Sequence, residues 1–530
     1  MKPPTQGDRP PKPAMGMGAL AAAAAHMLTR VSGLARDIVF VTFFGATAAA
    51  DAYFAAFRVP HLFRELLAEG TLANVFVPLF AETSQKEGLA NAWRLANALL
   101  GVLLLILGTL TLLIFVAADP LVTLVASGFD EQTHDLAATL TRIFSPFLAG
   151  ISIAALFSGM LNLQGRFFLP TLAPAVLNVF VIAGCLLSDT VEAQTGWPPI
   201  AAVAIAASLS GLVTAAVQYP ALRRAGFRFR PILQAHPGLA RVGKFVAAAL
   251  VSVIVVQFNL LVEMQIASHL EGSGQITWLM MGFRLVQLPM SVVAGSVAVA
   301  AVARISVELA QEQRDQAKAT LSRAIEMTSV LVLPAAAGLY VLAEPLVHLL
   351  YERGEFTASD TAGTAGVLQM YALAVVGICL YRVLLPVFFA LKDPYLPMKL
   401  SLGVMAAKFP IAWGLVYTAG LGIDGLPLSH GITVTAEVIA MLWVLRSRLG
   451  GYTDGFMGQH ARMVLATLVM TTVIAFINPM CVSLGAWGVV VTCIIGGVAY
   501  AGLALALRIR TAKDVQDKLI GKVLRRRPRP

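Results

Sequence analysis

Charged residues are scarce in this 530-residue chain, at 13%, whereas hydrophobic residues make up 58%. A water-soluble protein of this length needs a more polar surface, and a disordered chain contains fewer apolar residues. Cysteines are few as well, and all four lie in or beside apolar runs, which excludes a disulfide-stapled secreted module. The composition therefore predicts an all-α polytopic membrane protein.

Motifs for binding nucleotides or zinc are also missing. The chain has no G-x-x-x-x-G-K-[ST] loop for a nucleotide, and neither an H-E-x-x-H motif nor paired cysteines for zinc. The eight histidines are scattered, and His26 and His61 fall within apolar stretches. We therefore expect a transporter and not an enzyme, with no cofactor and no bound metal.

Long apolar stretches are what the chain has in abundance. A transmembrane helix needs roughly 20 apolar residues, and fourteen stretches qualify. They lie near 15–43, 48–82, 93–117, 139–163, 168–188, 198–222, 245–270, 275–303, 324–350, 364–391, 395–418, 425–445, 463–480 and 484–507. The second is too long for a simple crossing, so we expect it to bend or to extend beyond the bilayer.

The distribution of basic residues predicts the orientation. An even number of spans places both termini on one side, and cytoplasmic termini put thirty of the 39 Lys and Arg residues in cytoplasmic segments. Only Arg353 falls in an outer loop, as the positive-inside rule requires. The basic clusters at 223–230 and 525–529 are then orientation signals or contacts with anionic lipid, and we expect no nucleic-acid binding.

Eight cationic residues remain within the spans or at their edges. Each charge at the middle of a bilayer costs on the order of 2.5–3.5 kcal/mol, so such residues face the bundle interior or a wet cavity and often mark a substrate path. They are Arg30, Arg36, Arg58, Arg64, Arg142, Arg284, Arg382 and Lys408. Embedded carboxylates offer the alternative of structural ion pairs; these are Asp37, Asp51, Glu65, Glu69, Glu263 and Glu437.

Four of these arginines suit anion binding better than structural pairing. Arg30 and Arg36 are six residues apart, roughly 240° around a helix, so they cannot share one narrow seam. A broad cationic wall accommodates them better, and the guanidinium fork binds carboxylate or phosphate oxygens in pairs. We therefore predict an anion site that contains Arg30, Arg36, Arg64 and Arg284.

The first eighty residues carry a resemblance to a known family. Thr29-Arg-Val-Ser-Gly-Leu-Ala-Arg-Asp37, the run from Asp51 to Pro60, and Arg64-Glu-Leu-Leu-Ala-Glu-Gly70 resemble the MurJ (MviN) family. The resemblance covers nearly the whole chain and is densest at the N-terminus. Further matches are Phe76-Val77-Pro78, Arg284 with Pro289, 353–357 and 388–393.

The resemblance implies a lipid II flippase of the MOP exporter superfamily, in the bacterial cytoplasmic (inner) membrane. Such a protein moves the undecaprenyl-diphosphate-linked peptidoglycan precursor to the outer leaflet by alternating access, for cell wall biosynthesis. Its implied partners are lipid II, membrane lipids and the cell-wall synthesis machinery, and it would function as a monomer. The implied parts are a cytoplasmic tail (1–14), two pseudo-symmetric six-helix lobes around a central cavity (15–225 and 245–448), a basic cytoplasmic loop between them (226–244), two extra C-terminal helices that form a lipid-tail groove (449–510), and a basic tail (511–530).

The resemblance also implies roles for individual residues. Arg30, Arg36, Arg64 and Arg284 match the family's essential cavity arginines, and Asp51 and Glu69 match its important acidic positions. This sequence departs from the family at Phe283 and Gln287, where acidic residues are frequent.

Sodium coupling is uncertain on the same basis. Some members bind sodium through an acidic residue of the seventh span and Asn or Asp in the eleventh. In this chain Glu263 provides the acidic residue of the seventh span, but the eleventh span has Lys408 and Ala412 in place of Asn or Asp. One hypothesis is that the Lys408 ammonium pairs with Glu263 in place of the ion; the alternative is that Lys408 snorkels or pairs with Glu437.

Three other functions stay open. A flippase for another polyprenyl-diphosphate oligosaccharide shares the diphosphate chemistry, and only the motif match separates it from lipid II transport. A MATE-like exporter of cationic drugs would need an acidic cavity, whereas the first two spans are rich in arginine. A membrane scaffold that transports nothing would leave the embedded charges without a purpose.

Overall fold

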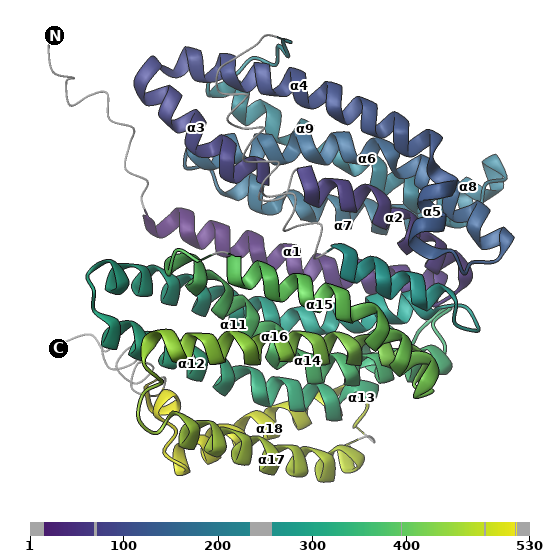
Figure 1. The fold of residues 1–530 in the computed structure, drawn as a ribbon. Helices are drawn as coiled ribbons and strands as arrows, with labels where there is room; N and C mark the ends of the chain where they lie inside the picture. Colours follow the sequence, from purple (N-terminus) through teal and green to yellow (C-terminus); the bar gives the residue numbers. More distant parts are fainter. Residues whose placement is uncertain are drawn as a thin grey trace, which may run out of the picture. The chain divides into compact units, whose positions relative to one another are not determined.

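The computed structural model describes residues 15–67, 71–233, 257–393, 395–481, 484–514 and 516. These residues form helices joined by short loops and include no strand (Figure 1). The chain divides into two compact units, Met1–Gln257 and Phe258–Pro530. The all-helical fold follows from the composition, because a long apolar segment satisfies its backbone groups within a bilayer by forming a helix.

In the first unit, α6 and α9 lie at the centre of the packing. α6 packs against α2, α4 and α9, while α7 packs against α1 and α9. Gly150 and Gly211 let the backbones of α6 and α9 approach closely, since a Cβ atom on Gly150 would lie 2.4 Å from the carbonyl carbon of Gly211. The helices are α1 (Met15–Phe44), α2 (Ala48–Leu67), α3 (Thr71–Glu87), α4 (Leu89–Val116), α5 (Ala118–Ala126), α6 (Glu131–Leu163), α7 (Phe168–Leu186), α8 (Ser188–Thr195) and α9 (Pro199–Arg224).

In the second unit, α14 takes the central position and packs against α11, α12 and α16. The hairpin of α17 and α18 packs on this group through α12. The elements are a helix over 257–268, α11 (Gln275–Ala310), α12 (Arg314–Val341), α13 (Ala343–Tyr351), α14 (Ala358–Ala390), α15 (Tyr395–Trp413), the π-helical turn η2 (Gly414–Thr418), the 3-10 turn η3 (Gly422–Asp424), α16 (Gly425–Leu449), α17 (Phe456–Cys481) and α18 (Ala486–Ala506).

The two units repeat one three-helix segment. α4, α5 and α6 contain 28, 9 and 33 residues, and α12, α13 and α14 contain the same numbers in the same order. The short helices begin alike, with Ala-Asp-Pro-Leu-Val from Ala118 and Ala-Glu-Pro-Leu-Val from Ala343. Each 33-residue helix has a capping carboxylate in or before its first turn: Asp130 accepts from the Thr133 backbone N–H at the start of α6, and Asp360 accepts from the Thr357 backbone N–H at the start of α14. This repeat supports the pseudo-symmetry of the two lobes.

Ten of the described helical segments are long and apolar enough to cross a membrane. Each of the fourteen predicted stretches contains described helix, and the count of fourteen stays a prediction. The second stretch is not one helix, since α2 ends at Leu67 and α3 begins at Thr71. The short helices α5 and α8 were not predicted, because a search for spans passes over helices of eight or nine residues. The predicted stretch 324–350 is also divided, since α12 ends at Val341 and α13 begins at Ala343.

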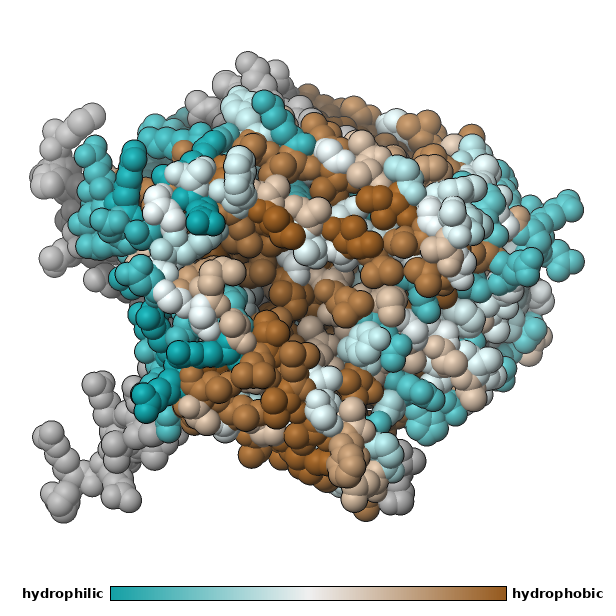
Figure 2. Space-filling model, turned by 60° about the horizontal axis from the view of Figure 1, so that its bottom comes forward, coloured by the Kyte–Doolittle hydropathy of each residue, from teal (hydrophilic) through white to brown (hydrophobic). Residues whose placement is uncertain are grey.

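The surface has the pattern that a bilayer requires. On the face drawn in Figure 2, apolar side chains gather in the middle and hydrophilic side chains gather toward the left and right sides of the view. In α17 and α18 the exposed apolar residues include Phe476, Trp487 and Val498, each at least 68% exposed. Exposed apolar side chains of this size are stable only in lipid or against a partner, and their number here favours lipid.

Candidate functional site

Arg36 is held at the seam between α1 and α7. Its Nε donates a hydrogen bond to Asp37 Oδ1 at 2.8 Å, and its Nη1 donates to Asn178 Oδ1 at 3.1 Å. Asn178 in turn donates from Nδ2 to Ser32 Oγ at 3.0 Å, which ties α7 to α1. The Asp37 carboxylate is buried, so the ion pair fixes the direction of the half-buried guanidinium.

Arg30 lies six residues before Arg36 on α1 and has a different environment. Its side chain is exposed, and within the described part of the chain no ion pair includes it. The neighbouring Thr29 Oγ1 donates to the Thr171 carbonyl at 3.1 Å, so this end of α1 is also attached to α7. Arg30 therefore extends from an anchored backbone with its charge accessible.

Arg64 lies on α2 beside a histidine and a carboxylate. Its Nη2 is 2.7 Å from His61 Nε2, and His61 Nδ1 is 3.2 Å from Glu65 Oε1. Residues three and four apart share one helix face, which brings the three side chains together. Asp51, in the first turn of the same helix, is 4% exposed, and Glu69 lies outside the described residues.

Arg284 lies on α11 in the second unit. Its Nη1 donates to Gln287 Oε1 at 3.3 Å, and its side chain is half-buried. Gln287 is one of the two positions at which the sequence departs from its family, and its neutral amide orients the guanidinium without cancelling its charge. Arg30, Arg36 and Arg64 belong to the other unit, so a cavity that contains all four arginines stays a prediction.

A buried charged network occupies the interior of the second unit. Lys408 Nζ donates to Glu263 Oε1 at 2.7 Å, and the two side chains are 0% and 4% exposed. Tyr371 donates its hydroxyl to Glu263 Oε2 at 3.2 Å, and His430 Nδ1 lies 3.6 Å from Oε1.

The network decides between the two pairings that the sequence left open for Lys408. Lys408 pairs with Glu263, whereas Glu437 accepts a hydrogen bond from Ser401 at 2.6 Å. The sequence analysis did not identify Tyr371 and His430 as members of this network. The feature that could have pointed to them is that both are polar residues within apolar stretches. A buried ion pair with extra hydrogen bonds is stable as a unit, because each partner compensates the other's loss of water.

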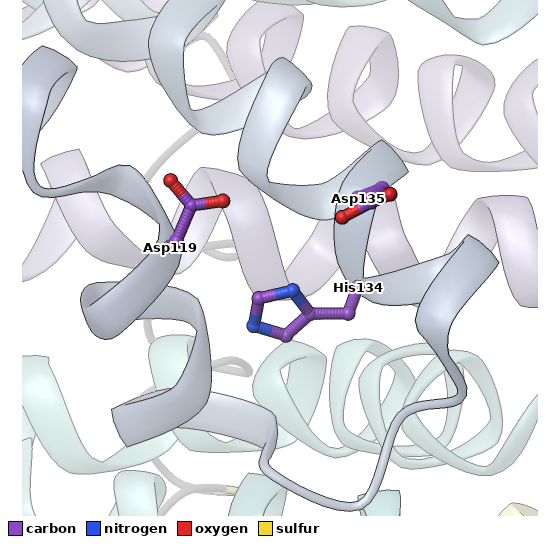
Figure 3. A group of neighbouring side chains, drawn as sticks. All are labelled: Asp119, His134 and Asp135. Carbon is purple, nitrogen blue, oxygen red and sulfur yellow. The ribbon is translucent and has the colours of Figure 1, made fainter.

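Arg142 has a structural partner. Its Nη2 lies 2.5 Å from Asp119 Oδ2, so this embedded arginine is paired at the corner between α5 and α6. Figure 3 shows the His134 ring extending from α6 toward α5 in the same corner, where His134 Nε2 is 3.0 Å from Thr123 Oγ1. Side-chain atoms of Asp119, His134 and Asp135 come within 4.8 Å of one another and could hold a metal ion. The Arg142 guanidinium competes for that place, because it already neutralises Asp119.

An apolar cavity of about 330 Å³ lies in the second unit, between the α11–α13 segment and the α17–α18 hairpin. Its lining suits a hydrocarbon ligand, since nearly all of the lining atoms are apolar. It is lined by Pro289, Pro334, Ala335, Gly338, Leu339, Leu342, Leu346, Met470, Ile474, Cys493 and Gly497.

Known proteins share both the sequence and the fold. The sequence model of the family described as "Lipid II flippase MurJ" matches residues 40–496. A relative from Burkholderia cenocepacia, named lipid II flippase MurJ, is 32% identical over 454 residues, which are 84% of this chain and 86% of that protein.

Two solved structures share the fold. One, titled as lipid II flippase MurJ in an inward closed conformation, matches with a TM-score of 0.77 at 23% identity, over 92% of this chain and 99% of that one. An inward-facing MATE family transporter of the MOP superfamily matches with a TM-score of 0.67 at 16% identity, over 82% of this chain and 98% of that one.

Proposed function

Because this chain belongs to the MurJ family of lipid II flippases, we propose that it moves lipid II from the cytoplasmic to the outer leaflet of the bacterial inner membrane. The observation that carries the proposal is the extent of the family match, which includes every helix from α2 to α17. The protein is a multi-pass membrane protein of that membrane with a transporter's fold. It has no catalytic role in this proposal.

The arginines bind the diphosphate of lipid II. Arg30, Arg36, Arg64 and Arg284 supply forked donors for its anionic oxygens, and Asp51 and Glu69 support them. The exposure of Arg30 favours this role, and Gln287 contributes a neutral amide to the surroundings of Arg284. Arg36 keeps a carboxylate partner, which orients the guanidinium toward the ligand.

The polyprenyl tail lies along the α17–α18 hairpin, within 449–510. The apolar cavity between this hairpin and α12 supports the assignment, because hydrocarbon chains need an unbroken apolar wall. Alternating access then consists of rocking of the lobes 15–225 and 245–448 about the headgroup, while the tail stays in lipid. Both termini are cytoplasmic by the positive-inside rule, and one copy of the chain is sufficient.

The transport cycle runs without sodium. The Lys408 ammonium places a full positive charge at Glu263, so a second cation there would be an uncompensated charge in the protein interior. We expect equal flipping in proteoliposomes in sodium and in choline buffers. A clear requirement for sodium would contradict this part of the proposal.

The test of the whole proposal replaces a host's own lipid II flippase with this protein and measures lipid II exposed at the outer leaflet. We expect rescue by the wild type and loss of exposure with Arg30→Ala, Arg36→Ala, Arg64→Ala or Arg284→Ala at equal expression. The matched control is Arg94→Ala, which removes an exposed arginine of α4 outside the proposed site. Exposure of a different polyprenyl-diphosphate lipid by the wild type would identify another cargo, and rescue by all four variants would make the arginines structural.

A further inference from the structure

His61 is in hydrogen-bond contact with Arg64, whose guanidinium can donate a hydrogen bond but cannot accept one. A guanidinium stays charged and only donates hydrogen bonds, so the His61 Nε2 atom 2.7 Å from Arg64 Nη2 must be the acceptor. A histidine nitrogen that accepts carries no proton, which leaves the ring proton on Nδ1. That nitrogen lies 3.2 Å from Glu65 Oε1, so the carboxylate favours the same tautomer.

We propose that His61 is a positioning residue for the transported diphosphate: its neutral ring holds the Arg64 guanidinium in place, and its protonation releases that guanidinium. The inference rests on the proposed function, because it takes Arg64 as a ligand of the diphosphate. A protonated ring has an N–H donor at both nitrogens, so Nε2 then repels the guanidinium it previously held. The same step strengthens the attraction between the ring and Glu65.

The local backbone suits this arrangement. Pro60 lies inside α2 directly before His61, and a proline there removes one helical hydrogen bond and loosens the turn. The Phe57 ring lies 5.8 Å from the imidazole and packs against Phe144 of α6. His61 is therefore supported from one side by an aromatic cluster, while its two nitrogens face charged groups.

Charged groups on the neighbouring helices have partners or lie at helix ends. α2 packs against α3, α5, α6 and α9. On α2 itself, beside His61, the charged and titratable groups are Asp51, Tyr53, Arg58, Arg64 and Glu65. On α3 they are Glu82 and Lys86, which pair, and Glu87 at its end. Asp119 of α5 pairs with Arg142 of α6, and Glu131, His134 and Asp135 lie in the first turns of α6. On α9 they are Tyr219, Arg223 and Arg224, toward its end. The two His61 contacts given above, to Arg64 and Glu65, lie within α2, and Gln257 of the helix over 257–268 donates a hydrogen bond to Glu65 Oε2.

The experiment measures flipping of fluorescent lipid II by the full chain in proteoliposomes between pH 5 and 8, where histidine titrates. Wild-type activity is expected to fall toward pH 5. His61→Gln keeps an acceptor for Arg64 and does not titrate, so it should remain within about twofold of the wild type at pH 8 and lose the acid-side decline. His61→Leu removes the acceptor and should be about tenfold slower at pH 8.

The matched control is His269→Gln, which changes an exposed histidine beyond the helix over 257–268 and should keep the wild-type profile. A His61→Leu variant with the wild-type rate and pH profile would overturn the inference. If the wild type does not flip lipid II at all, the proposed function fails instead. Binding of undecaprenyl diphosphate by the same variants then decides the role of His61, with pH-dependent binding lost in His61→Leu as the supporting result and unchanged binding as the contrary one.

Discussion

The two units treat embedded charge in opposite ways. On α1 and α2 the arginines are exposed or half-buried, and their contacts include the Asp37 carboxylate, an amide and an imidazole. In the second unit the Lys408 and Glu263 side chains are almost fully buried and face each other at 2.7 Å. A charge that keeps access to its surroundings can change partners during transport, whereas a buried pair cannot separate without a large cost. We therefore expect the first group to bind the transported anion and the second to remain a fixed internal pair.

The largest effect should come from breaking the buried pair. Lys408→Met leaves the Glu263 carboxylate buried and uncompensated, which we expect to lower the free energy of unfolding by about 3–5 kcal/mol. The double variant Lys408→Met with Glu263→Gln should recover most of that loss. Thermal unfolding of the purified protein measures both, and a single variant as stable as the wild type would show that the pair is not needed.

A smaller effect on stability, but a large one on transport, should follow from Arg36→Ala. The half-buried guanidinium makes hydrogen bonds that contribute about 1.5–3 kcal/mol each when one partner is charged. We expect lipid II exposure to fall at least tenfold, and Arg36→Lys to recover only part of it because an ammonium lacks the planar fork. Normal transport by Arg36→Ala would assign this arginine to the α1–α7 seam alone.

Packing in the first unit can be disturbed without touching a charge. Gly150→Ala places a methyl group against the backbone of Gly211, and overpacking of this kind costs about 1–3 kcal/mol. Gly108→Ala is the matched control, since no atom lies within 4 Å of its added carbon. Equal melting temperatures for the two variants would show that α6 and α9 can move apart freely.

The smallest effect concerns an accessible ion pair of the second unit. The hydrogen bond from Arg448 holds the pKa of Asp393 below its ordinary value of 3.8. A lowered folded-state pKa stabilises the fold above the unfolded value and loses that contribution as the pH falls through the folded value. Asp393→Asn should therefore lower the melting temperature slightly at pH 7, where the ion pair is formed, and this difference from the wild type should disappear as the pH falls below about 4.

The sequence predicted the helices well because a membrane span depends on length and hydropathy, which are local properties. Three of the four arginines of the predicted anion site lie on α1 and α2, the helices that the sequence predicted for them. Their partners could not be predicted in the same way. Asn178 contacts Arg36 from 142 residues away, and His430 joins Glu263 only because α16 packs nearby.

The choice of partner for Lys408 illustrates the same limit. Both Glu263 and Glu437 were available in neighbouring spans, and hydropathy does not distinguish them. Packing selects Glu263, since Ser401 on α15 already binds Glu437. Arg142 was predicted as an embedded cation for a similar reason, because its partner Asp119 lies 23 positions away, in the first turn of α5.

The pair of Glu263 and Lys408 also orders the biogenesis of the protein. The two residues are 145 positions apart, so the ribosome makes the carboxylate first and the ammonium much later. At roughly 5–20 residues per second, the helix that carries Glu263 waits about seven to thirty seconds for Lys408. During that interval the carboxylate has not yet met its ammonium partner, and this part of the second unit cannot complete its packing before α15 has been inserted.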